Sequence, residues 1–272
     1  TVAARGSSVP VIATLHNAPP RSGLGAIVSA LLHRIACRGS ERILAVSPDL
    51  HERATSLSAR AVERAVIPGG IGIVEQDSVV DTEPSKDTTA ALPLSVLVIA
   101  RLAPQKGLDD LLDALGTLDC QQPSAPQWIV RIAGDGPLRH HFESRIRDEE
   151  LPVQLLGYRR DVPALLSEAD LVVQPSVWEG QPVAVQEALR AKRAIVATDA
   201  GGTRWVTGDA ALLVPPSAPD KLAEALEALL CGPTAAQERC DLERRAAIRA
   251  DELPTLEDLA AQLTKVLHLE RP

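Results

Sequence analysis

Two carboxylates, Glu179 and Glu187, lie on either side of a corner where a buried strand is expected to turn into a helix. Residues 170–176 form an apolar run that ends at a proline and a serine, and Pro182 is well placed to open a helix over residues 183–190. Ligands of open α/β sheets bind at the carboxyl ends of the strands. Two glutamates at such positions, taken alone, are more often a solvated residue and an ordinary surface charge. A binding role is therefore supported only by the motifs in the neighbouring segments.

Two cations, Arg101 and Lys106, follow the apolar run 94–100 in what we expect to be a second strand-to-helix loop. The planar fork of an arginine and the compact charge of a lysine can converge on a pyrophosphate. The amino end of the next helix adds positive potential there. The alternative is an ordinary loop lysine and a surface arginine.

The elements that would position these groups alternate between strand and helix, which predicts parallel sheets covered by helices on both faces. Strands are expected at residues 11–15, 42–46, 65–67, 94–100, 128–133, 154–156, 170–176, 194–198 and 212–214. Helices are expected at residues 24–36, from 48 onward behind a Ser47 cap, and at 108–118, 138–147, 162–168, 183–190, 221–230, 235–249 and 256–267.

The stretch 68–93 loses periodicity and is polar, which is typical of an interdomain linker. Three strands precede it and six follow, whereas a whole Rossmann half needs about six. We therefore predict two domains: a partial N-terminal Rossmann-like domain with the linker at 1–90, and a complete Rossmann-like domain with C-terminal helices at 91–272.

Composition argues against nucleic acid as a partner. The 272 residues are 45% hydrophobic and 24% charged, with a net charge of −8 and only three Trp, one Tyr and one Phe. The acidic excess lies wholly in the second part of the chain. Stacking platforms and positive charge, which single-stranded nucleic acid requires, are both scarce.

The cysteines at 37, 120, 231 and 240 form no CxxC pair, and no His lies at metal-ligand spacing. Neither a disulfide framework nor a zinc site is indicated, so a cytoplasmic location is expected. The apolar runs 24–32 and 90–100 fall short of the ~20 residues that span a bilayer. Because the chain has no Met and begins at Thr1, we expect its start to have been processed, cut or engineered.

The basic stretch 33–38 is expected to be a solvated helix face. A partner chain or the inner face of an anionic membrane is the alternative for this stretch.

The corner motif Pro-Ser-x-Trp-Glu-Gly-x-Pro-x4-Glu-Ala-Leu at 175–189, with the Gly201-Gly202 pair after the next strand, resembles the nucleotide-sugar site of retaining glycosyltransferases of the GT-B architecture, family 4. Arg-Leu-x3-Lys-Gly at 101–107 is similar to the diphosphate grip of that family. The resemblance runs from about residue 9 to about residue 267. It implies an α/β, GT-B type fold with two Rossmann-like parallel-sheet domains, the first incomplete.

The resemblance also implies roles for individual residues. Arg101 and Lys106 would stabilise the leaving diphosphate, Glu187 would accept hydrogen bonds from ribose hydroxyls, and His16 would face the donor sugar from the first domain. Glu179 would hold the sugar ring together with the backbone of Gly180, Gln181, Pro182 and Val183. Nucleotide positioning would fall to Gly134, Gly157, Tyr158 and Arg159, with the backbone around Tyr158 reading the base edge.

The activity implied is metal-independent transfer of a hexose from a nucleoside-diphosphate sugar to a hydroxyl acceptor with retention of configuration. The leaving phosphate would help to deprotonate the acceptor, so neither Glu need be a nucleophile. No cofactor is expected; the donor would be a UDP- or GDP-sugar, and the acceptor a glycan, a lipid-linked sugar or a small molecule.

Four features depart from the family pattern, one of which is the run Ala191-Lys192-Arg193-Ala194 in place of a small-residue turn. A glycine-rich loop that receives the acceptor has no counterpart before Val9, the run 69–72 replaces an Asn-Gly-x-Asp turn, and Trp205 stands where Glu is common. A second hypothesis therefore stands: a non-catalytic or partner-dependent nucleotide-sugar-binding module, either a fragment or one half of a split enzyme. A sugar-nucleotide epimerase of related architecture is a third.

Overall fold

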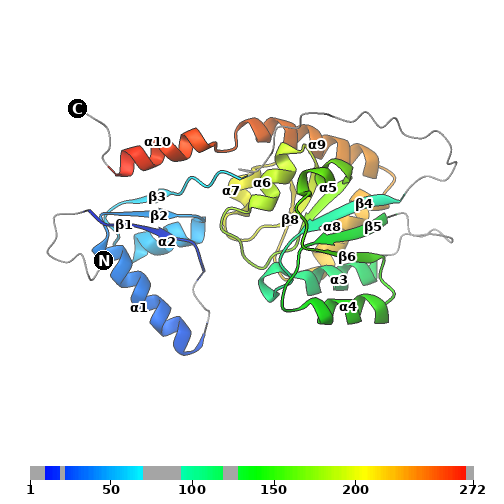
Figure 1. Cartoon of the computed structure of the whole chain (residues 1–272), viewed down its shortest axis with the longest axis horizontal. Helices are drawn as coiled ribbons and strands as arrows, with labels where there is room; N and C mark the ends of the chain where they lie inside the picture. The colour runs from blue at the N-terminus through cyan, green and yellow to red at the C-terminus, as the bar shows by residue number, and fades with distance from the viewer. Residues whose placement is uncertain (1–9, 19–21, 70–92, 119–127, 268–272) are drawn as a thin grey trace.

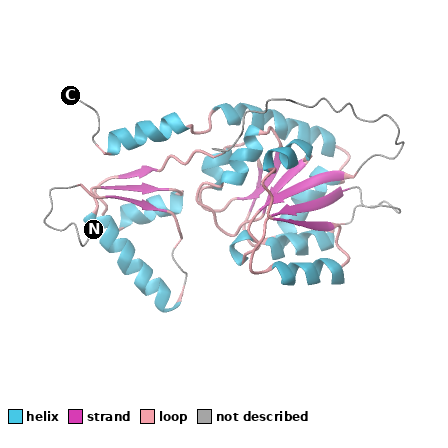
Figure 2. Cartoon of the chain, viewed as in Figure 1, coloured by secondary structure: helices cyan, strands magenta, loops and turns pink. Residues whose placement is uncertain are grey.

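The chain folds into two parallel α/β units in a computed structural model that describes residues 10–18, 22–69, 93–118 and 128–267 (Figure 1). A smaller sheet lies at the N-terminal side and a larger one follows residue 93. Helices cover the strands of the larger unit, and the last helix runs back across to the smaller one (Figure 2). The expected α/β fold with two parallel sheets is confirmed.

The first sheet has three described strands, β1 (Ile12–Leu15), β2 (Arg42–Ala45) and β3 (Val62–Arg64), in the order β1-β2-β3. Helix α1 (Gly23–Gly39) connects β1 to β2, and α2 (Pro48–Ser56) connects β2 to β3. The core of this unit joins strand and α2 side chains to Val266 of α10 (Leu256–Val266), which explains why the last helix returns to the first domain.

Two local expectations in this unit were wrong. The third strand was expected at residues 65–67 but ends at Arg64. Beyond it, the amide of Val66 bonds to the Gln262 side chain and the carbonyls of Ala65 and Ile67 accept from glutamines, so side chains replace a neighbouring strand there. Ser47 precedes α2 as expected, but its side chain makes no capping bond.

The second sheet has six parallel strands in the order β6-β5-β4-β7-β8-β9. Its strands are β4 (Leu94–Ile99), β5 (Trp128–Ala133), β6 (Val153–Gly157), β7 (Leu171–Gln174), β8 (Ala194–Thr198) and β9 (Leu212–Val214). The sheet is built outward in both directions from the neighbouring strands β4 and β7. Open α/β sheets bind ligands at such a point, where the strand order reverses.

The helices of this unit lie in two layers. Their bounds are α3 (Leu108–Thr117), α4 (Arg139–Asp148), α5 (Val162–Glu168), α6 (Val183–Arg190), α7 (Thr203–Thr207), α8 (Pro219–Leu230) and α9 (Ala235–Asp251). One apolar cluster packs α3, α4 and α8 on one face of the sheet, and another packs α5, α6 and α7 on the other. Helix α7 and a 3-10 turn at Pro104–Lys106 were not anticipated.

The predicted linker lies outside the described residues except at its two ends.

Cys231 is disulfide-bonded, so the expectation of reduced cysteines was wrong at this position, whereas Cys37 and Cys240 are free. Within the described ranges, no helix is long and apolar enough to cross a membrane, and no cluster of three or more potential ligands could hold a metal ion.

Candidate functional site

The loops that carry most of the predicted site residues leave the carboxyl ends of β4, β5, β6 and β7, which meet at one edge of the parallel sheet. This edge contacts the first domain: the Trp178 indole donates to Asp49 at 3.0 Å, and the Gln181 amide donates to the Ala65 carbonyl at 2.7 Å. The sequence motifs therefore converge where the two units of the chain meet.

The loop after β4 is fastened to the loop after β7. The Gln105 side chain donates to the Trp178 carbonyl at 2.9 Å, and the Val177 amide donates to the Gln105 carbonyl at the same distance. Gly107 has a left-handed φ of 61°, and a Cβ there would lie 2.0 Å from the Pro175 carbonyl oxygen. Only glycine lets the two loops approach this closely.

This approach brings Lys106 and Glu179 together. The Lys106 ammonium lies 2.6 Å from a carboxylate oxygen of Glu179, and Glu179 is only 8% exposed. The sequence analysis assigned Lys106 to the diphosphate and Glu179 to the sugar ring. It did not predict that the two side chains form an ion pair. The two loops hold this partly buried charge pair in place, and an anionic ligand would compete with Glu179 for Lys106.

Glycines also set the position of the Glu179 backbone. The Gly202 amide donates to the Glu179 carbonyl at 3.0 Å, and a Cβ on Gly202 would meet the Gly180 carbonyl at 1.9 Å. A Cβ on Gly180 would lie 2.8 Å from the Val46 side chain in the first domain. The Gly201-Gly202 pair therefore serves close packing of backbone segments around Glu179.

Gly134 and Gly157 form a second glycine contact at the ends of β5 and β6. The Gly134 amide donates to the Gly157 carbonyl at 2.8 Å, and a Cβ on Gly134 would lie 1.9 Å from the Ala100 carbonyl. Gly157 has a φ of 70° and turns the chain toward Tyr158 and Arg159, which are both exposed. These residues frame the same sheet edge as Arg101.

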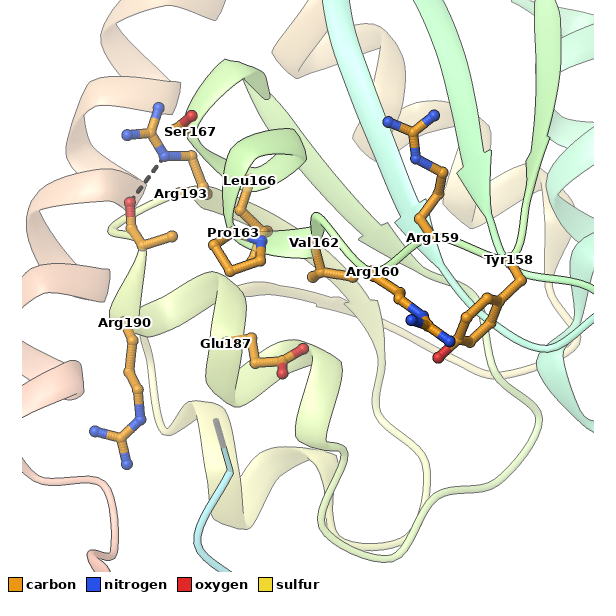
Figure 3. A pocket seen from close by; sticks show the side chains of 11 residues that line it. Tyr158, Arg159, Arg160, Val162, Pro163, Leu166, Ser167, Glu187, Arg190 and Arg193 are labelled. Atoms are coloured by element: carbon orange, nitrogen blue, oxygen red, sulfur yellow. Dashed lines mark hydrogen bonds between the residues drawn. The ribbon is translucent and has the colours of Figure 1, made fainter. Parts of the chain in front are cut away.

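A cavity of about 500 Å³ lies between this turn and α5 and α6 (Figure 3). Glu187 of α6 lines it opposite Tyr158 and Arg160, and its carboxylate points into the space below Val162. Glu187 is half-buried, and burial raises the pKa of its carboxyl. The carboxylate has no hydrogen-bond or ion-pair partner in the part of the chain that the structure describes.

The arginines around this cavity are largely engaged elsewhere. Arg159 pairs with Asp161, Arg190 donates to the Pro254 carbonyl at 3.0 Å, and Arg193 donates to the Ala191 carbonyl at 2.8 Å. Figure 3 shows the Arg190 side chain pointing away from Glu187, and the Arg160 guanidinium next to the Tyr158 ring. Glu187 is thus a hydrogen-bond acceptor open to a ligand that carries hydroxyl groups.

Gln186, the neighbour of Glu187 on α6, was missed by the sequence analysis. It is fully buried, donates to the Ile67 carbonyl at 3.0 Å and accepts from the Gly69 amide at 2.9 Å. Its signal was a polar residue at an inward position of an otherwise apolar helix face. Together with Gln181, it fixes α6 against the chain that leaves the first sheet.

The remaining predicted residues are not joined by direct contacts. His16 is exposed at the carboxyl end of β1. Arg101 is exposed after β4, and its guanidinium has no hydrogen-bond or ion-pair partner among the described residues. Pro182 is buried as the N-cap of α6, and Val183 is exposed in its first turn. No contact links Arg101 or Lys106 to Glu187, so their convergence on one ligand stays a prediction.

A family model described as glycosyl transferases group 1 matches residues 93–231, just over half of the chain. Among curated proteins, TuaC of Bacillus subtilis, named for teichuronic acid biosynthesis, is 29% identical over 235 residues, covering 83% of this chain and 56% of that protein. The alpha-D-kanosaminyltransferase of Streptomyces kanamyceticus is 31% identical over 170 residues, covering 58% of this chain and 40% of that enzyme. The chain thus spans about half the length, or less, of these relatives.

Solved structures share the fold across nearly the whole chain. HepE of Anabaena, in a complex with UDP and glucose, superposes with a TM-score of 0.76 at 21% identity, covering 99% of this chain and 74% of HepE. TarM of S. aureus superposes with a TM-score of 0.72 at 16% identity, covering 96% of this chain and 51% of TarM. At these identities the likeness concerns the fold, which is that of GT-B glycosyltransferases.

Proposed function

The chain belongs to the glycosyl transferases group 1 family, and on that premise we propose that it binds a nucleoside-diphosphate sugar at the carboxyl edge of its second sheet. The observation that carries the proposal is the half-buried carboxylate of Glu187, which has no partner among the described residues and faces the Tyr158–Arg160 turn across the cavity. A carboxylate accepts two hydroxyl hydrogen bonds at once, which suits the vicinal diol of a ribose.

Lys106 and Arg101 supply the electrostatic part of the proposal. Charge builds on the diphosphate as the glycosidic bond breaks, and fixed cations at a sheet edge stabilise it without a metal. Lys106 is paired with Glu179, so this carboxylate keeps the cation in place. A diphosphate that approaches Lys106 would leave Glu179 available to a sugar hydroxyl.

We further propose that the reaction is transfer of a hexose to a hydroxyl acceptor with retention of configuration. HepE, which shares the fold, was crystallised with UDP and with UDP-glucose, and this supports a UDP-sugar as the first donor to test. His16, at the end of β1, would approach the donor from the first domain. The acceptor would be a glycan, a lipid-linked sugar or a small molecule.

The test of donor binding is calorimetric titration of the purified chain with UDP-glucose, UDP and GDP. Glu187→Ala should weaken nucleotide binding about 10- to 100-fold, because the ribose hydroxyls lose a charged acceptor. Glu224→Gln removes a carboxylate from the exposed face of α8 and is the matched control. Equal affinity of the Glu187 variant and the unchanged chain for every nucleotide would exclude the ribose role.

Measuring donor turnover distinguishes an active transferase from a non-catalytic binding module. Release of UDP from UDP-glucose, by hydrolysis or transfer, should be measurable with the purified chain and should fall when Glu179 is replaced by Gln. Tight binding of the donor with no UDP release, alone or with added acceptors, would instead favour the non-catalytic module.

A further inference from the structure

Arg64, the last residue of β3, extends its side chain from the first unit to the second. One guanidinium nitrogen donates to the Trp205 carbonyl at 3.0 Å and to the Gln181 amide oxygen at 3.5 Å. The guanidinium carbon lies 5.0 Å from the centre of the Trp205 ring, which is within the range of a cation–π contact. One side chain of the first unit therefore contacts both the loop before α6 and helix α7.

These two segments of the second unit are the ones that surround the Glu179 backbone. Gly202, the N-cap of α7, donates to the Glu179 carbonyl at 3.0 Å. Gln181 follows Glu179 by two positions, and its side-chain amide nitrogen donates to the Ala65 carbonyl at 2.7 Å. The loop at 179–183 is thus bonded to Arg64 and Ala65 of the first unit as well as to Gly202.

Arg64 is held in this place against the repulsion of a second cation. Arg249 of α9 donates to the same Trp205 carbonyl at 2.8 Å, and partial burial together with the Arg249 charge lowers the pKa of Arg64. Arg249 is paired with Glu252, whereas no carboxylate within the described ranges pairs with Arg64. A cavity of about 480 Å³ lies beside the two arginines, so packing does not fix Arg64 on that side. Its position therefore depends on its contacts with Trp205 and Gln181.

We propose that Arg64 and Trp205 are positioning residues for the sugar part of the donor. Arg64 acts through Gln181 on the backbone at 180–183, which would hold the sugar ring beside Glu179, so the inference rests on the proposed function. The groups proposed for the diphosphate and the ribose, Lys106 and Glu187, lie on other segments of the second unit. A change at Arg64 should therefore alter the sugar subsite and leave the nucleotide subsite in place.

The experiment is calorimetric titration with UDP-glucose and with UDP. Arg64→Gln should weaken UDP-glucose binding about fivefold or more and UDP binding less than about twofold, because only the sugar-holding loop loses its support. Arg64→Lys keeps a positive charge near the Trp205 ring and should bind UDP-glucose better than Arg64→Gln does. Trp205→Leu keeps the main-chain carbonyl and should show a smaller loss of the same kind.

The matched control is Arg244→Gln, which removes an arginine from the exposed side of α9, where it pairs with Asp241. This variant should bind both ligands like the unchanged chain. If Arg64→Gln weakened UDP and UDP-glucose equally, Arg64 would support the fold as a whole and the proposal would be overturned.

A second measurement needs no ligand. Hydrogen exchange at the amides of Gly180, Gln181 and Val183 should be faster in Arg64→Gln than in the unchanged chain, while exchange in β5 stays the same. Unchanged exchange at 180–183 would overturn the proposal. Failure of the unchanged chain to bind either nucleotide would overturn the proposed function and this inference with it, whereas UDP-glucose binding that Arg64→Gln leaves unchanged would overturn this inference alone.

Discussion

The two sheets of this chain are stabilised in different ways. The six-stranded sheet is covered by helices on both faces, with separate apolar clusters on each side. The three-stranded sheet depends on a single smaller cluster, to which the last helix of the chain contributes Val266. Its helix α1 directs large side chains outward. The second sheet is thus packed by its own helices, whereas the core of the first sheet also includes side chains of α10 and of the second unit.

The contact between the two units is mostly polar. Gln181, Gln186 and Gln262 each bond to main-chain groups of residues 64–69, and Trp178 bonds to Asp49. The bonds from Gln181 to Ala65 and from Gly69 to Gln186 are buried, so breaking them would leave polar groups unpaired, whereas apolar contacts hold the inside of the second unit. The site residues are therefore held within the second unit by its own core, whereas polar bonds from side chain to main chain join them to the first unit.

The largest expected change in the free energy of unfolding comes from a substitution in the core of the six-stranded sheet. Leu171→Ala in β7, a fully buried position, should lower the free energy of unfolding by about 2–5 kcal/mol. Leu31→Ala, at a 58% exposed position of α1, should change it by less than about 0.5 kcal/mol. Denaturant unfolding followed by far-UV circular dichroism, which reports on the helices of both units, measures both changes. Equal losses for the two variants would remove the contrast between the sheets.

The next largest effect concerns the joint between the units. Gln186→Leu should cost about 1–3 kcal/mol for each main-chain group left buried and unpaired, the Gly69 amide and the Ile67 carbonyl. Hydrogen exchange should become faster in β2 and β3 and stay unchanged in β4.

Gln237→Leu on the exposed side of α9 is the control for that substitution. If the Gln186 variant exchanged faster throughout the six-stranded sheet instead, Gln186 would be a part of the second core and not a connector between the units.

How much of this could be predicted from the sequence differs between the two units. In the second unit the strands at 128–133, 194–198 and 212–214 and the helices at 162–168 and 183–190 are confirmed to the residue. Here continuous apolar runs are buried from both sides, so periodicity carries the information. In the first unit the third strand was misplaced, because glutamines distant in sequence bond to residues 65–69.

The candidate site shows the same limit. The motifs located Glu179, Glu187 and Lys106 at one sheet edge, and glycines indicated close backbone approaches. The pairing of Lys106 with Glu179 depends on the loop contact through Gln105 and Gly107, which no local pattern encodes. The outward face of α1 was also missed, because periodicity shows that a helix has an apolar face but not which way the face points.

A smaller effect tests the diphosphate role of Lys106 within the second unit. Lys106→Gln should reduce the preference for UDP over UMP by about 1.5–3 kcal/mol, because a charge-assisted hydrogen bond to the phosphate is lost. Lys221→Gln is matched, since Lys221 also pairs with a glutamate, Glu224, but on α8. Calorimetric titration of both nucleotides gives the preference directly. A Lys106 variant that distinguishes UDP from UMP as well as the unchanged chain would assign the diphosphate to other residues.

The smallest effect follows from the pKa of Glu187, which burial raises. Because the folded protein holds this proton more tightly than the unfolded chain, ionised Glu187 lowers stability. The penalty is absent below the pKa of the unfolded chain, appears as the pH rises through the folded pKa, and is constant above it.

Glu187→Gln should therefore raise the free energy of unfolding at pH 7.5, by less than about 1 kcal/mol because the half-exposed carboxylate keeps part of its hydration. The gain should vanish near pH 4. Thermal unfolding of the variant and the unchanged chain at both pH values measures it, with Glu224→Gln as the exposed control. A Gln variant that is less stable at pH 7.5 would mean that Glu187 stabilises the fold, and its openness to a ligand would lose its support.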